Sequence, residues 1–417
     1  MKRFMSIAMA SAMAMTLFAG CGSTASEGTD AAAGTDTTAT ADTAAEGTDA
    51  TAEGTAAAGE SAAGGVFKIG GIGPTTGGAA VYGMAVQNAA QLAVDEINAA
   101  GGIGGYQIEF KFEDDENDPE KSVNAYNTLK DWDMQILMGT VTSGCCVAVV
   151  EKTSADNMFQ LTPSGSSIEA IKYDNAFRVC FSDPNQGMAS AKYIGDNAVA
   201  TKVAVIYDSS DIYSSGIYQK FVTESASQPF EIVSAEAFTA DSKTDFSVQL
   251  QKAKDSGADL VFLPIYYTEA SLILSQAATM NYSPIFFGCD GLDGILDVEN
   301  FDTSLAEGVM LLTPFAADAQ DELTQNFVTT FKEKFGDTPN QFAADAYDAI
   351  YAIKAAAEKA GLTPDMDASA ICDAMKTAMT QITLDGLTGV GMTWDASGEP
   401  NKAPKAVKIE NGVYVAM

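Results

Sequence analysis

Apolar and polar residues follow a repeated order of strand and helix after about residue 66. Short runs that are apolar, or that alternate with period two, predict strands at residues 67–72, 106–112, 135–139, 159–162, 202–207, 231–238, 259–265 and 284–288. Apolar positions three and four apart predict helices at residues 82–99, 144–157, 213–227, 244–256 and 268–280. Two βαβ series of this kind predict an α/β fold of two lobes, each a doubly wound parallel sheet.

The order changes towards the C-terminus. Helices are predicted at residues 321–335, 341–360 and 368–379, and short strands at residues 391–394, 406–410 and 413–416. We expect these helices to cover the first lobe and the last strands to join the second. Crossings near residues 183–185, 312–314 and 388–390 would then form a three-crossover hinge. The N-terminal lobe would hold residues 66–183 with 315–388, and the C-terminal lobe residues 184–314 with 389–417.

The N-terminus has the pattern of an export signal. Lys2 and Arg3 precede an apolar stretch over residues 4–19, which is too short for a comfortable membrane span. Small residues then lead into Cys21, as a lipoprotein signal peptidase requires. We expect residues 1–20 to be a signal peptide and Cys21 to carry a lipid that anchors the chain to the outer face of the cell membrane. An ordinary signal peptide with an incidental cysteine is the alternative.

Residues 21–65 form a segment of different composition. After Cys21 it contains almost only Ala, Thr, Gly, Ser, Asp and Glu, with no aromatic or basic residue. Such a composition buries too little apolar surface to offset chain entropy, and its acids repel one another, so we expect an extended, disordered tether. No later segment is long and apolar enough to span a membrane. The folded body would therefore work beside the membrane.

The charge and the residues that are missing exclude several classes of function. A net charge of −33 would repel nucleic acid. The chain has no histidine, the commonest general base and zinc ligand, and no other cluster suggests catalysis, a metal or a cofactor. Five cysteines follow Cys21, at positions 145, 146, 180, 289 and 372, and we expect most of them to be small buried side chains. The acidic run at residues 114–118 favours a helix-start turn at Asp118, with calcium binding as the alternative.

Two strand ends are rich in hydroxyl groups and small residues. They lie at residues 139–144 and 161–167. Open parallel sheets bind ligands at the carboxyl ends of their strands, where free N–H groups and helix dipoles favour an anion. These loops could hold a carboxylate without any arginine, although their Ser and Thr residues could also simply cap helices.

The second half supplies the opposite charge. Asp290 follows an apolar strand and would pair with a ligand ammonium group. Tyrosines at strand ends, Tyr82, Tyr213, Tyr266 and Tyr267, can wall a pocket. An anion cradle, an acid and an apolar wall together describe a site for a zwitterionic amino acid.

The chain resembles the leucine/isoleucine/valine-binding family of type I periplasmic binding proteins, the receptors of branched-chain amino-acid ABC importers. The motifs that carry the resemblance lie in order at residues 72–77 (IGPTTG), 82–83, 95–103, 114–119, 162–164, 211–216, 306–308 and 394–395. The resemblance implies a two-lobed receptor that closes on its ligand and is recognised by an ABC permease. We expect a monomer.

The resemblance also implies roles for residues of the first lobe. Ser143 would hold the α-carboxylate of the ligand with its hydroxyl group. Ser164 would offer its backbone N–H and C=O, and Ser166 its N–H and hydroxyl, to the carboxylate and the ammonium group of the ligand. Tyr82 and Val141 would line the pocket for the ligand side chain.

In the second lobe, the resemblance gives Asp290 the place of the acid that binds the ammonium group, where relatives often have Glu. Tyr213 and Tyr266 would close over the ligand, with Tyr267 as an alternative to Tyr266. Thr142 stands where some members have a disulfide cysteine, so we expect that bridge to be absent. An amide, an aromatic acid or a short peptide is the alternative ligand, and solute sensing is the alternative role.

Overall fold

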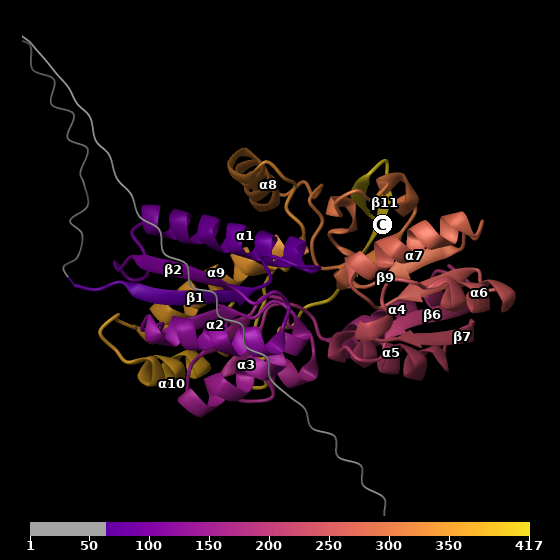
Figure 1. Cartoon of the computed structure of the whole chain (residues 1–417). Coiled ribbons are helices and arrows are strands. Elements are labelled where there is room, and N and C mark those ends of the chain that lie inside the picture. The colour runs from indigo at the N-terminus through magenta and orange to yellow at the C-terminus, as the bar shows by residue number, and fades with distance from the viewer. Residues whose placement is uncertain (1–63) are drawn as a thin grey trace, which may run out of the picture. The chain divides into compact units, whose positions relative to one another are not determined.

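The computed structural model describes residues 64–417 (Figure 1). The expected signal peptide, Cys21 and nearly all of the expected tether lie outside the described residues. The described part contains two α/β lobes, as the sequence predicted.

The first lobe is built on a sheet of five parallel strands in the order β2-β1-β3-β4-β5. These strands are β1 (Phe67–Gly73), β2 (Ile108–Asp114), β3 (Ile136–Gly139), β4 (Gln160–Thr162) and β5 (Ala176–Arg178). The helices of this lobe are α1 (Ala80–Ala99), α2 (Pro119–Asp131), α3 (Ser143–Asp156), α8 (Glu322–Phe335), α9 (Gln341–Ala360) and α10 (Ala368–Met379).

Helices cover this sheet, and its strands differ in burial: the edge strand β2 alternates apolar and charged residues, whereas the inner strands are largely buried. All four residues of β3 are buried, as expected for a central parallel strand. Both α9 and α10 contact β3, and α9 also packs along α1 (Figure 1). The prediction that helices from the end of the chain return to the first lobe is therefore confirmed.

The acidic run at residues 114–118 is used in hydrogen bonds. The Asp118 carboxylate accepts the backbone N–H of Glu120 (2.8 Å) and caps α2, as predicted. Asp114 accepts the N–H of Thr75 (2.9 Å), and Asp115 is buried. Within residues 64–417, no group of three or more acids or cysteines is placed to hold a metal ion. These bonds favour the turn over a calcium site.

The second lobe is built on a seven-stranded sheet in the order β12-β11-β10-β9-β8-β6-β7. Its strands are β6 (Lys202–Asp208), β7 (Glu231–Phe238), β8 (Leu260–Leu263), β9 (Ile285–Gly288), β10 (Met310–Thr313), β11 (Lys405–Glu410) and β12 (Val413–Ala416). Its helices are α4 (Asp183–Asp196), α5 (Ile212–Ser225), α6 (Ser247–Asp255) and α7 (Tyr267–Thr279), with short 3-10 turns η3 (Asp290–Leu292) and η4 (Ile295–Asp297). The final hairpin joins this sheet as predicted, but it runs antiparallel.

The sequence analysis missed two strands and one α-helix, and it placed one strand wrongly. It did not predict β5, α4 or β10. The strand predicted at residues 391–394 is wrong: that region forms only isolated bridges, Leu384 with Met392 and Trp394 with Pro400. Trp394 reads as a strand residue because it is apolar, but its indole N–H instead donates to the carbonyl of Arg178 (2.7 Å).

The last segment that crosses between the lobes contacts the first lobe at residues later in the chain than the predicted crossing. Lys402 forms a buried ion pair with Asp345 of α9 (2.8 Å). This segment therefore keeps first-lobe partners beyond the crossing predicted at residues 388–390. The lobe limits themselves stay a prediction.

All five cysteines of the described residues are free and buried, which confirms the prediction that they are small core side chains. Burial raises the pKa of each of these thiols. In the described part of the chain, no helix is both long and apolar enough to cross a membrane.

Candidate functional site

The two hydroxyl-rich loops lie side by side at the carboxyl ends of β3 and β4. Ser143 is the first residue of α3, and its hydroxyl oxygen accepts the backbone N–H groups of Ser166 (3.2 Å) and Ser167 (3.1 Å). Ser164 donates its hydroxyl to the carbonyl of Val141 (2.7 Å). The predicted loops therefore form one connected wall, which presents hydroxyl groups and the positive end of the α3 dipole.

A buried arginine donates hydrogen bonds to the backbone of this wall. Arg178 is fully buried and donates from one guanidinium nitrogen to the carbonyl oxygens of Gly165 (3.1 Å) and Ser166 (2.5 Å). Its other terminal nitrogen lies 3.2 Å from the carboxylate of Glu399. Sequence reasoning missed Arg178, and the only available signal was an isolated arginine among apolar residues.

The second lobe provides the opposite wall. Tyr213 donates its hydroxyl to the Asp290 carboxylate (2.7 Å), and the same hydroxyl oxygen accepts the N–H of Gly291 (2.9 Å). A side chain at Gly291 would meet the Tyr213 hydroxyl at 2.6 Å, so only glycine permits this close approach. The side-chain oxygen of Gln186 accepts the N–H of Asp290 (3.1 Å). Gln186 was not predicted.

Burial controls the charge of this acid. Asp290 is 4% exposed, and desolvation raises its pKa to about 7, although the hydrogen bond from the Tyr213 hydroxyl acts in the opposite direction. Burial also raises the pKa of Asp183, at the start of α4, whose Oδ1 has no hydrogen-bond partner among the described residues. Neither carboxylate has a cationic side chain as a hydrogen-bond or ion-pair partner among the described residues. A cationic group of a ligand between the lobes would therefore stabilise the charged form of Asp290.

Aromatic rings fill the space between the two walls. Tyr82 packs against Phe342 (ring centroids 4.2 Å apart) and against Tyr266 (5.7 Å), and Tyr266 stacks on Tyr213 (4.9 Å). The Tyr82 hydroxyl also crosses between the lobes and donates to the carbonyl of Gly291 (2.5 Å). Phe342 was missed because it follows a crossing far along the chain.

These residues surround a small inner cavity of about 10 Å³, which has room for about one water molecule. Its lining residues are Tyr82, Val141, Thr142, Ser143, Ser164, Tyr266, Asp290, Gly291 and Phe342. Of the remaining candidates, Ser166 bonds to Ser143 and Tyr213 bonds to Asp290. The structure thus brings all eight candidate positions together.

An outer pocket of about 470 Å³ is lined by Tyr213 and Tyr266 and by residues at the N-terminal ends of α3 and α5. Tyr266 lines both spaces, whereas the Tyr267 hydroxyl oxygen accepts the N–H of Val81 (3.1 Å) outside them. Between the two alternatives left open by the sequence, the geometry favours Tyr266.

Two α/β lobes with one polar site between them define a class of binding proteins. The chain belongs to the periplasmic binding protein family, whose sequence model matches residues 66–412.

Two relatives illustrate the similarity in sequence. The Leu/Ile/Val-binding protein homolog 3 of Brucella melitensis is 32% identical over 303 residues, which cover 72% of this chain and 80% of that protein. The leucine-, isoleucine-, valine-, threonine- and alanine-binding protein of Pseudomonas aeruginosa is 28% identical over 306 residues, covering 73% of this chain and 80% of the relative.

Two solved structures illustrate the similarity in fold. The branched-chain amino acid transporter substrate-binding protein LivJ of Streptococcus pneumoniae, in complex with isoleucine, matches with a TM-score of 0.77 at 29% identity, covering 84% of this chain and 98% of that one. A solute-binding protein of an ABC transporter from R. palustris, in complex with benzoate, matches with a TM-score of 0.75 at 21% identity, covering 85% and 96%, and is similar in fold alone.

Proposed function

We propose that the chain is the substrate-binding lipoprotein of an ABC importer and binds a small neutral amino acid, branched-chain or similar, between its lobes. One observation supports this most directly: a wall of hydroxyl and N–H donors and a buried carboxylate face the same cavity. The proposed role contains no catalytic step. The relatives named for leucine, isoleucine and valine binding support the same ligand class.

In the proposed mechanism, the ligand first binds to the open first lobe. Ser143 receives the α-carboxylate, and Ser164 and Ser166 contact the carboxylate and the ammonium group. The present bonds of Ser166 to Ser143 and of Ser164 to Val141 are replaced. The second lobe then closes, so that Asp290 meets the ammonium group and Tyr213 and Tyr266 cover the ligand. The inner cavity is much smaller than any of these amino acids, so the aromatic rings must move as the ligand enters.

An aromatic acid is the main alternative ligand, because a protein of the same fold binds benzoate. Such a ligand has a carboxylate but no ammonium group. It would leave Asp290 buried without a cationic partner, and this observation favours an amino acid. The same body could also serve solute sensing.

The test is a binding series that removes one charged end of the ligand at a time. Isothermal titration calorimetry would compare leucine, valine and alanine with the corresponding amides and N-acetyl compounds. We expect tight binding of at least one free amino acid and a large loss when either end is neutralised. Equal binding of an amino acid and its N-acetyl derivative would refute the assignment of Asp290.

We also propose that the chain is exported as a monomer and anchored by a lipid on Cys21, with a membrane permease as its partner. Metabolic labelling with a fatty-acid analogue should mark the wild-type chain and not Cys21→Ser. The Cys372→Ser variant is the matched control, because Cys372 is buried in the folded body and should leave labelling unchanged. Equal labelling of wild type and Cys21→Ser would refute the anchor.

A further inference from the structure

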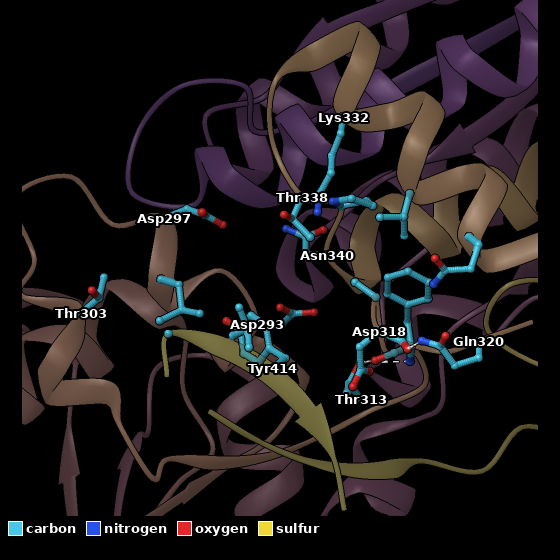
Figure 2. Close-up of a pocket in the computed structure, with 18 residues that line it drawn as sticks. Asp293, Asp297, Thr303, Thr313, Asp318, Gln320, Lys332, Thr338, Asn340 and Tyr414 are labelled. Carbon is cyan, nitrogen blue, oxygen red and sulfur yellow. Dashed lines mark hydrogen bonds between the residues drawn. The ribbon is translucent and has the colours of Figure 1, made fainter. Parts of the chain in front are cut away.

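A second and larger pocket lies where the chain passes from β10 to α8. We call it the crossover pocket; its volume is about 610 Å³, within the usual range for small-molecule sites (Figure 2). It shares no lining residue with the inner cavity or the outer pocket of the cleft. Its lining residues are Asp293, Leu296, Asp297, Thr303, Thr313, Phe315, Ala317, Asp318, Gln320, Gln325, Val328, Lys332, Thr338, Pro339, Asn340, Gly412, Val413 and Tyr414.

The pocket contains a buried carboxylate with one unused oxygen. Asp293 is 4% exposed, and its Oδ2 accepts the backbone N–H of Gln341 at the start of α9 (2.8 Å). Its Oδ1 has no hydrogen-bond partner among residues 64–417. A buried polar atom without a partner costs free energy that a ligand donor would recover. Asp293 is therefore the natural anchor of the site.

The charges around this anchor select the sign of the ligand. Asp297 and Asp318 also line the pocket, and Lys332 of α8 is its only basic lining residue. Figure 2 shows Lys332 reaching in from α8, with Asp318 and Gln320 at the other end of the pocket. None of the ion pairs found within residues 64–417 joins Lys332 to these acids. The excess of carboxylates favours a cationic ligand.

The apolar lining residues of the crossover pocket indicate that the ligand contains hydrocarbon. Leu296, Phe315 and Val328 contribute hydrocarbon surface, and Tyr414 contributes an aromatic face. Burial raises the pKa of Asp293 to about 7, while the hydrogen bond from the Gln341 N–H acts to lower it. A short methylene chain that ends in an ammonium group would satisfy both the apolar surface and the acid.

We propose that the crossover pocket is a second binding site, for a short aliphatic amine whose ammonium group pairs with the free oxygen of Asp293. This proposal does not depend on the amino-acid function of the cleft. Asp297 and Asp318, which are exposed at the pocket, would attract the ligand and pair with a second ammonium group where it has one.

The test uses putrescine as the probe and the full-length purified chain, followed by calorimetry. We expect Asp293→Asn to weaken putrescine binding by roughly tenfold or more, because a charge-assisted bond is lost. The amide oxygen can still accept the Gln341 N–H, so the fold should be retained. Asp131→Asn, an exposed site on α2 with the same change of charge, is the matched control and should bind as the wild type does.

A gain of affinity separates the site from general damage to the fold. Lys332→Gln removes the one basic side chain that faces the pocket and should tighten putrescine binding several-fold. The proposal is overturned if the wild type does not bind putrescine at millimolar concentrations, or if Asp131→Asn and Asp293→Asn weaken binding equally. It is also overturned if Asp290→Asn abolishes binding while Asp293→Asn does not, because the amine would then occupy the cleft.

Discussion

The two walls of the cleft differ in charge and in how their polar groups are paired. The first-lobe wall is neutral: its serines bond to one another and to backbone groups, and Arg178 holds the loop from below. The second-lobe wall contains Asp290, a buried acid whose desolvation is only partly compensated by the hydrogen bond from Tyr213. The first wall is thus preorganised without a ligand, whereas the second gains most when a cation arrives.

The largest expected effect comes from removing the charge of the second wall. We predict that Asp290→Ala weakens amino-acid binding by about 3–5 kcal/mol, because the buried ammonium group of the ligand would lose its partner. Calorimetry on the wild type and the variant measures this loss. Asp131→Ala, which removes an exposed acid on α2 outside the cleft, is the control for the loss of a carboxylate. An unchanged dissociation constant in Asp290→Ala would contradict the assignment.

A smaller loss is expected from the neutral wall. Ser143→Ala removes the hydroxyl that organises the N–H groups of Ser166 and Ser167, and should weaken binding by about 1.5–3 kcal/mol. Ser154→Ala, on the same helix but away from the cavity, is the matched control. A loss equal to that of Asp290→Ala would show that the two walls do not differ as described.

The contrast between the walls also predicts a dependence on pH. Without ligand, Asp290 has a pKa of about 7, and a bound ammonium group would lower it, so binding should release a proton below pH 7. Affinity should rise by up to about tenfold per pH unit towards pH 7 and then level off. Calorimetry in buffers of different ionisation enthalpy measures the released proton. Burial also raises the pKa of Asp183, so Asp290→Asn is the control that should remove the part of the pH dependence that comes from Asp290.

The same shift affects the stability of the empty protein, with the sign set by the raised pKa. The folded state holds the Asp290 proton more tightly than the unfolded chain does, whose ordinary value is 3.8. This contribution to the free energy of unfolding is fully present below about pH 4 and is lost as the pH rises through about 7. Urea unfolding of the wild type and of Asp290→Asn at both ends of this range measures the contribution. We expect the free energy of unfolding of the wild type to fall more with rising pH than that of Asp290→Asn.

The smallest effect is expected where the walls meet. Tyr82→Phe keeps the ring but removes the hydroxyl that donates to Gly291 across the cleft, and should weaken binding by about 0.5–1.5 kcal/mol. Tyr106→Phe, a tyrosine of the first lobe outside the cleft, is the control. Small-angle scattering should show a shift towards the open form, and an unchanged profile with unchanged affinity would argue against an interlobe role for this bond.

The sequence predicted the parts of the site that depend on local rules. The carboxyl ends of neighbouring parallel strands meet at one sheet edge, so the loops that hold Ser143 and Ser164 were expected to lie together. Asp290 was found because it follows an apolar strand. These inferences need only the order of the strands.

The parts that the sequence did not reveal depend on contacts between distant segments. Phe342 reaches the cavity only because α9 returns to the first lobe after the chain has crossed the hinge. Arg178 lies in a strand of three residues, too short to show a pattern, and its role is visible only from the carbonyl groups that it holds. Trp394 was misread because periodicity cannot separate a strand residue from a side chain anchored by one hydrogen bond.

The position of Tyr82 has a consequence for any redesign of the pocket. Its ring lines the inner cavity, where we propose that the ligand side chain binds, and its hydroxyl donates to the carbonyl of Gly291 in the second lobe. A smaller residue at position 82 would make room for a bulkier ligand, but it would also remove the hydrogen bond between the two lobes. Ligand selectivity and the equilibrium between the open and closed forms therefore depend on the same side chain. A variant that changes selectivity alone would need another hydrogen-bond donor between the lobes.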